Sequence, residues 1–160
     1  MKIFYKKLSE EQIKDLSRSE IKKLQSKTGR EIVDYIAKNI YKIENPEIIV
    51  ENSKPKFLNS DIHFSITHSN RIVAVAFDKF PVGFDIEYIK DRDFAGLAKH
   101  YNITVTEKTG FYKKWTQIEA EIKIQSEIKQ SLTELFDSEY MMSIVSSNPE
   151  ELKFELTNLS

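Results

Sequence analysis

Apolar residues recur at helical spacing in two long stretches of the chain. From Thr28 to Ile43 the spacing predicts a core helix, which Asn45-Pro46 ends because the residue before a proline avoids the helical conformation. From Phe111 it predicts a second core helix, and a helix-like composition persists to about Leu135. The side chains expected to be buried are Ile32, Val33, Ile36, Ile40 and Tyr41 in the first helix and Phe111, Trp115, Ile118 and Ile122 in the second.

Other stretches have the patterns of strands. Residues 62–67 and 82–88 alternate between apolar and polar, and residues 72–77 are almost continuously apolar, which predicts three adjacent, antiparallel strands. Shorter strands are predicted over residues 2–6, 48–50, 141–145 and 153–156, a loop over residues 53–56, and a further helix over residues 92–101. A helix followed by strands thus occurs twice. We expect an α+β fold in one domain, 1–160, with approximate halves 1–84 and 85–160.

Composition and charge narrow the class of protein. Of the 160 residues, 40% are hydrophobic and 31% are charged, as in soluble globular proteins. The net charge of −1 gives no indication of nucleic-acid binding, and the absence of cysteine excludes disulfides, thiolate catalysis and cysteine-ligated zinc. No segment approaches the roughly 20 apolar residues of a membrane span, and no signal peptide is visible. We expect a cytoplasmic protein without membrane contact.

Two stretches carry candidate chemistry. Side chains two apart on a strand share a face, so Asp85 and Glu87 project the same way, about 7 Å apart along the chain. Four-residue spacing places Trp115, Glu119 and Lys123 on one face of a helix. Three carboxylates beside a lysine can hold Mg²⁺ next to a phosphate. The alternative is that the strand carboxylates are a solvated face and that the helix pair is an ordinary surface ion pair.

The order of four motifs resembles one family. G-F-D-I-E at 83–87 and W-T-Q-I-E-A-E-I-K at 115–123 resemble the paired signature of the 4'-phosphopantetheinyl transferases. H-F-S-I-T-H-S at 63–69 and S-K-P at 53–55 look like its two upstream motifs. The chain is most similar to the larger, surfactin-synthetase-activating class, in shortened form. That resemblance implies a pseudo-dimer of two similar halves, each a helix packed on a small, mainly antiparallel sheet, and a monomeric protein.

The resemblance also implies a reaction and roles for individual residues. A serine hydroxyl of an apo acyl or peptidyl carrier protein attacks the β-phosphate of coenzyme A, which gives holo carrier protein and adenosine 3',5'-bisphosphate. Glu119 is expected to be the base for the serine proton, and Lys123 to contact the phosphate. The implied Mg²⁺ ligands are Asp85, Glu87 and Glu119; the implied coenzyme A contacts are Arg30, Lys54, Thr67, His68, placed just past a strand end, and Lys123.

Departures from the pattern keep other functions open. Ile118 stands where the family usually has lysine, and the second half is short. A catalytically inactive relative that binds coenzyme A or a partner protein is therefore an alternative. A scaffold without a ligand, whose carboxylates are merely solvated, is another. Arg30 belongs to a basic run with Lys22, Lys23 and Lys27, and such runs are usually solvated helix faces.

Overall fold

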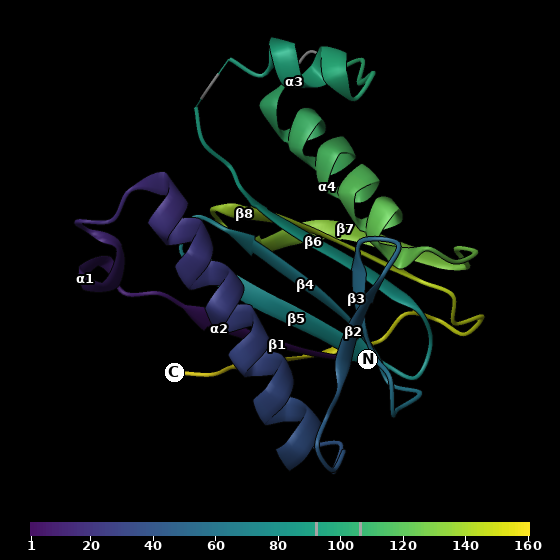
Figure 1. Cartoon of the computed structure of the whole chain (residues 1–160). Coiled ribbons are helices and arrows are strands. Elements are labelled where there is room, and N and C mark those ends of the chain that lie inside the picture. The colour runs from purple at the N-terminus through teal and green to yellow at the C-terminus, as the bar shows by residue number, and fades with distance from the viewer. Residues whose placement is uncertain (92, 106) are drawn as a thin grey trace.

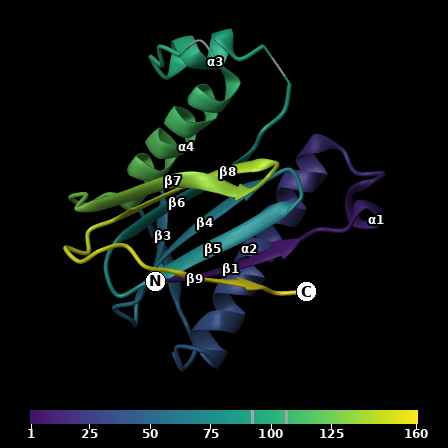
Figure 2. The ribbon, with the colours of Figure 1, turned by 180° about the vertical axis from the view of Figure 1, so that it is seen from behind.

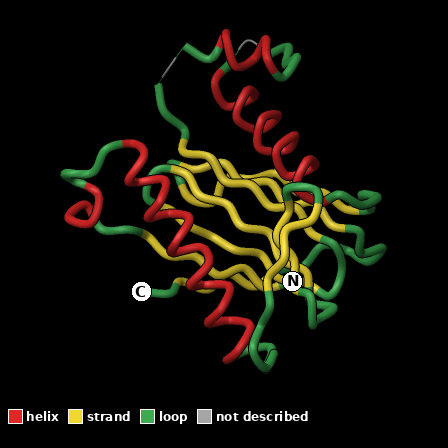
Figure 3. Tube along the Cα trace, in the orientation of Figure 1, coloured by secondary structure: helices red, strands yellow, loops and turns green. Residues whose placement is uncertain are grey.

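Two sheets lie face to face, and one long helix covers the outer side of each. The structure is a computed structural model that describes residues 1–91, 93–105 and 107–160. Figure 1 shows helix α2 (Arg18–Asn39) across one sheet and helix α4 (Lys108–Ile124) across the other. The same arrangement appears in Figure 3, with the helices in red on opposite sides of the yellow strands. The α+β class expected from the sequence is confirmed.

The larger sheet has the strand order β4-β5-β1-β9. Its members are β4 (His63–Ser69), β5 (Ile72–Asp78), β1 (Lys2–Lys7) and β9 (Glu155–Asn158). β5 pairs antiparallel with both β4 and β1, whereas β9 runs parallel to β1 at the edge, as Figure 2 shows from behind. β9 thus places the last strand of the described chain beside the first.

The smaller sheet has the strand order β6-β8-β7 and is antiparallel throughout. Its members are β6 (Val82–Tyr88), β8 (Tyr140–Ser146) and β7 (Gln130–Asp137). β8 is buried along its whole length. It lies between β6 and β7 within the sheet, and α4 covers one of its faces while the larger sheet covers the other. β6 is left at an edge, and this edge faces β4.

Clusters of buried side chains hold the layers together. Val73, Val75 and Phe77 of β5 pack with α2, while Ile72, Ala74 and Ala76 on its other face pack with the smaller sheet. This two-sided burial confirms the interpretation of residues 72–77 as a strand covered on both faces. A third cluster joins α4 to β8 and to α3 (Ala95–His100), with Phe111, Tyr112 and Trp115 at its centre.

The long helices differ in their bounds from the prediction. α2 begins at Arg18, where Ser17 and Glu20 form a capping box, and it ends at Asn39 rather than Ile43. Short α1 (Glu10–Ile13) precedes it. α3 begins at Ala95, while position 92 of the helix predicted there lies outside the described residues. α4 stops at Ile124 because Gln125 adopts a left-handed conformation, with φ of 52°.

Further predictions about the fold were wrong. Residues 130–135 belong to β7 and not to a helix, because pairing with β8 overrides the helical preference of their sequence. Ile122 is 61% exposed and not part of the buried side of α4, which includes Thr116 and Ala120 instead. The third of the three strands expected side by side, β6, pairs with β8 and not with β5.

The loop predicted over residues 53–56 is largely a strand. β2 (Ile48–Glu51) and β3 (Lys54–Phe57) form a separate antiparallel hairpin, which rises toward the end of α4 in Figure 1. Its turn residues Asn52 and Ser53 both have positive φ, as two-residue hairpin turns require. Proline is tolerated at position 55 because a two-stranded hairpin leaves one side of each strand unpaired.

The backbone of α4 approaches its sheet closely at Gly83. A Cβ atom there would lie 2.0 Å from the backbone oxygen of Ala120. We therefore expect Gly83→Ala to lower the free energy of unfolding by about 3 kcal/mol, because rigid backbone would have to move. Gly96→Ala is the control: nothing lies within 4 Å of its Cβ position, so urea unfolding should show no loss. Equal stability of Gly83→Ala and the wild type would contradict this packing.

Candidate active site

Side-chain hydroxyl groups join the facing edges of β4 and β6. Every second residue of β4 from Ser65 to Ser69 accepts a hydrogen bond from a backbone N–H of β6, with a constant offset of 19 residues, so the strands run side by side in the same direction. The N–H groups of Phe84, Ile86 and Tyr88 donate to the hydroxyls of Ser65, Thr67 and Ser69, at 3.1, 3.1 and 3.0 Å. We call these three hydroxyl residues the hydroxyl seam. It provides hydrogen-bond acceptors for these N–H groups, which point away from β8 and have no backbone partner from a neighbouring strand among the described residues.

Asp85 lies in the middle of β6 and is 4% exposed. Its Oδ1 accepts hydrogen bonds from Lys123 Nζ at 2.7 Å and from Thr67 Oγ1 at 3.1 Å. Its Oδ2 is buried and has no hydrogen-bond partner within residues 1–91, 93–105 and 107–160. A buried carboxylate oxygen without a donor is costly for the fold, and a bound cation would offset that cost.

Burial, the largest influence, raises the pKa of Asp85 above its ordinary value of 3.8, although Lys123 and Thr67 act in the opposite direction. The negative charge of Glu119 also raises the pKa of Asp85. Glu119 of α4 therefore acts electrostatically on Asp85 of β6.

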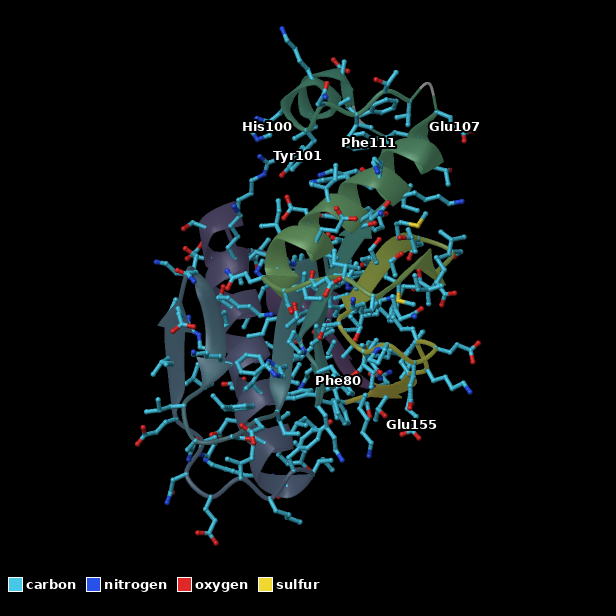
Figure 4. The ribbon with its side chains drawn as sticks, turned by 90° about the vertical axis from the view of Figure 1, so that its right-hand side faces the viewer. Phe80, His100, Tyr101, Glu107, Phe111 and Glu155 are labelled. Carbon is cyan, nitrogen blue, oxygen red and sulfur yellow. The ribbon has the colours of Figure 1, made fainter. Side chains whose placement is uncertain are left out.

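The other two predicted carboxylates have hydroxyl partners of their own. Glu87 Oε2 accepts a hydrogen bond from Ser69 Oγ at 2.7 Å. Glu119 Oε1 accepts a short hydrogen bond from the hydroxyl of Tyr101, the residue that follows α3. Figure 4 shows Tyr101 where the α3 segment faces α4. This hydrogen bond is the main reason why the pKa of Tyr101 is raised.

A common metal site for the three carboxylates stays a prediction. In the part of the chain that the structure describes, no group of three or more His, Cys, Asp or Glu side chains is arranged to hold a metal ion. The donor set nevertheless fits a hard divalent cation: three carboxylates, one of them with the buried oxygen described above.

A cavity of about 980 Å³ opens beside Asp85. Its volume is at the upper end of the range for small-molecule sites. The walls come from both helices, the hairpin and both sheet edges, and include Arg30, Val50, Pro55, His68, Asp85 and Lys123. The structure therefore brings predicted coenzyme A contacts from α2, β4 and α4 to one cavity, next to a predicted metal ligand.

His68 faces this cavity from within β4 rather than from beyond the end of a strand, which corrects the prediction. Burial lowers the pKa of His68 below its ordinary value of 6.5, and the positive charge of Lys123 lowers it further. The imidazole is therefore neutral at neutral pH and can both donate and accept hydrogen bonds. Thr67 also borders the cavity, but its hydroxyl is engaged with Asp85 and Ile86.

Lys54 lies in a smaller cavity of about 230 Å³, which Lys123 also lines. The Lys54 ammonium donates to two backbone carbonyls, Val82 O at 3.0 Å and Ile124 O at 3.3 Å. It thus joins the hairpin to the start of β6 and to the end of α4. Burial lowers the pKa of Lys54 to about 8.

This lowered pKa makes stability depend on pH. Because the folded protein disfavours protonated Lys54, the free energy of unfolding should rise as pH increases from about 8 toward the ordinary value of 10.5. Lys54→Met should remove this rise. Lys56→Met is the matched control, since Lys56 lies on the same strand in a partly exposed ion pair with Glu51. Unfolding curves that respond to pH equally in all three proteins would contradict the assignment.

The sequence analysis missed two residues that contact predicted ligands. Ser69 ends the H-F-S-I-T-H-S motif and Tyr101 ends the helix predicted over residues 92–101, but the sequence predicted a ligand contact for neither. The alternation that groups Ser65 with Thr67 extends to Ser69 and could have indicated it. No sequence signal connects Tyr101 to Glu119, because the contact depends on how α3 packs against α4.

Comparisons with known proteins point the same way as the geometry. No protein-family model matches the chain. It is 35% identical, over 89 residues and 47% of its length, to a Haemophilus influenzae protein whose name assigns it to the 4'-phosphopantetheinyl transferases. It is 36% identical, over 83 residues and 46% of its length, to a 4'-phosphopantetheinyl transferase of Aneurinibacillus migulanus. These matches span 38% and 35% of the relatives' own lengths. The chain is thus similar to 4'-phosphopantetheinyl transferases over somewhat less than half of its residues.

Proposed function

We propose that this protein transfers 4'-phosphopantetheine from coenzyme A to a serine of an apo acyl or peptidyl carrier protein. The observation that carries the proposal is the shared cavity. Arg30, His68 and Lys123 line it together with the buried carboxylate of Asp85. The similarity to named transferases supports the same reaction.

The cavity suits a ligand with several phosphates. Arg30 and Lys123 reach it from opposite helices, and neither is held by more than one carboxylate in the described contacts. A guanidinium and an ammonium at separate points can bind separate phosphate groups. The hairpin adds apolar walls at Ile48 and Val50, against which uncharged parts of a ligand can pack. Coenzyme A combines these features.

Asp85, Glu87 and Glu119 are the residues that would hold Mg²⁺. When bound, the ion would supply positive charge beside the pyrophosphate. Lys123 donates to Asp85 Oδ1 in the ligand-free protein, and in the complex we propose that it turns to a phosphate oxygen and stabilises the leaving group.

Glu119 is the proposed base. It accepts the proton of the carrier serine as the serine oxygen forms a bond to the β-phosphorus and the bond to the bisphosphate breaks. The products are the holo carrier protein and adenosine 3',5'-bisphosphate, so atoms and charge balance. Glu119 is only half-buried, which leaves its carboxylate accessible to a docked carrier.

The finer assignments belong to the same proposal. We place the protein in the larger, surfactin-synthetase-activating class, with its two helix-covered sheets as the similar halves of a pseudo-dimer. A monomeric, cytoplasmic protein is consistent with this class. Among the described residues, no helix is long and apolar enough to cross a membrane.

The test is incubation of the protein with coenzyme A, Mg²⁺ and several apo carrier proteins, followed by mass spectrometry. We expect the mass of at least one carrier to rise by one phosphopantetheine group, and the rise to disappear when EDTA replaces Mg²⁺. No gain on any carrier, together with measurable coenzyme A binding, would favour the alternative of a catalytically inactive coenzyme A-binding relative. The isoleucine at position 118, where the family usually has lysine, and the short second half motivate that alternative.

A further inference from the structure

Each predicted metal ligand accepts a hydrogen bond from one hydroxyl group. Thr67 Oγ1 donates to Asp85 Oδ1 at 3.1 Å, and Ser69 Oγ donates to Glu87 Oε2 at 2.7 Å. The Tyr101 hydroxyl donates to Glu119 Oε1. Two of the donors come from β4, and the third is Tyr101, the residue that follows α3.

The direction of two of these hydrogen bonds is fixed by the hydroxyl seam. A hydroxyl group has a single proton. Thr67 Oγ1 already accepts the N–H of Ile86, and Ser69 Oγ accepts that of Tyr88. Each hydroxyl still has its own proton to donate, and the ionised carboxylates of Asp85 and Glu87, which can only accept, accept the two hydrogen bonds. The seam thus aligns β6 and orients its acidic side chains with the same atoms.

A neutral donor is suited to this task. It fixes the orientation of a carboxylate without cancelling its negative charge, which then remains available to a cation. At Asp85, Thr67 and Lys123 both donate to Oδ1, which fixes the orientation of the carboxylate. The other oxygen, Oδ2, has no hydrogen-bond partner within the described residues. Hydroxyl donors around carboxylates are a typical outer layer of metal sites, where they orient the ligands.

We infer that Thr67, Ser69 and Tyr101 are positioning residues, which orient Asp85, Glu87 and Glu119 to bind a divalent cation. This inference rests on the proposed function. It gives Thr67 a role beside its predicted contact with coenzyme A, and it gives roles to Ser69 and Tyr101, for which the sequence indicated none.

The variants remove hydroxyls with little change in shape. Thr67→Val, Ser69→Ala and Tyr101→Phe should each weaken Mn²⁺ binding by about 10-fold or more, measured for the full chain from the free-ion EPR signal. Thr67→Ser should restore an affinity close to that of the wild type. Tyr101→Phe keeps the ring packed near Trp115, so it remains informative even if Thr67→Val does not fold.

Ser65→Ala is the matched control for the seam. Ser65 accepts the N–H of Phe84 in the same way, but no carboxylate accepts its proton in the contacts of the described residues. Thermal unfolding should show that Ser65→Ala and Ser69→Ala lose similar stability, while only Ser69→Ala loses Mn²⁺ affinity. An equal loss of affinity in both would overturn the inference, because it would show a purely structural role.

Two further outcomes separate this inference from the proposed function. If the wild type transfers phosphopantetheine and the three hydroxyl variants bind Mn²⁺ as it does, the inference is wrong and the function stands. If the wild type binds Mn²⁺ and the variants weaken it, but no carrier is modified, the positioning role stands and the transferase proposal fails. A wild type that binds no Mn²⁺ overturns the inference.

Discussion

Glu119→Gln is expected to slow phosphopantetheine transfer by about 10²- to 10⁴-fold, the contribution that a positioned general base usually makes. An amide has nearly the shape of the carboxylate but cannot take the serine proton. Tyr101 can still donate to its oxygen, so the α3–α4 contact is retained. The measurement is the initial rate of holo carrier formation by mass spectrometry, with thermal unfolding to confirm that the fold is unchanged.

Glu121→Gln is the matched control on the same helix. Glu121 is also half-buried, and it accepts a hydrogen bond from Gln117 within α4, at 2.8 Å. Its loss should leave transfer near the wild-type rate. Equal rates in Glu119→Gln and the wild type would remove Glu119 from the mechanism, whereas equal losses in both variants would point to a change in α4 as a whole.

The two partners of the Asp85–Lys123 ion pair should have opposite effects on stability. Lys123→Met leaves a buried carboxylate without its cation and should cost about 3 kcal/mol in the free energy of unfolding. Asp85→Asn removes the buried charge while leaving the Lys123 ammonium 28% exposed to water, and should stabilise the fold by about 1 kcal/mol. We expect both variants to lose transfer activity.

The pH dependence checks the sign of the Asp85 effect. Because the pKa of Asp85 is raised in the folded state, its stabilising contribution is complete below the ordinary value of 3.8 and is lost as pH rises through the folded value. The advantage of Asp85→Asn should therefore grow between acidic and neutral pH. Urea unfolding with EDTA present measures it in the absence of metal. An Asn variant that is less stable than the wild type at pH 7 would show that the ion pair outweighs the cost of burial.

A stable but inactive Asp85→Asn variant would have a clear interpretation. The fold would be retaining an unfavourable buried charge, with an oxygen that lacks a donor in the described residues, for the sake of its chemistry. Such a conflict between stability and function is typical of active sites.

Local periodicity explains which parts of the fold the sequence could predict. Residues 72–77 are apolar in succession, and a strand covered on both faces is the arrangement that buries all of them. The prediction failed at residues 130–135, where glutamate and leucine favour a helix but pairing with β8 decides the conformation. It failed again at Ile122, because which side of α4 is buried depends on the sheet it meets.

The sequence by itself determined that Asp85 and Glu87 share one face of a strand and that Glu119 and Lys123 share one face of a helix, since both follow from backbone periods of two and 3.6 residues. Only the tertiary structure decided what these side chains meet: Lys123 on Asp85, Ser69 on Glu87 and Tyr101 on Glu119. These contacts join residues 18 or 38 positions apart, and their distances depend on how sheets and helices pack rather than on any local pattern.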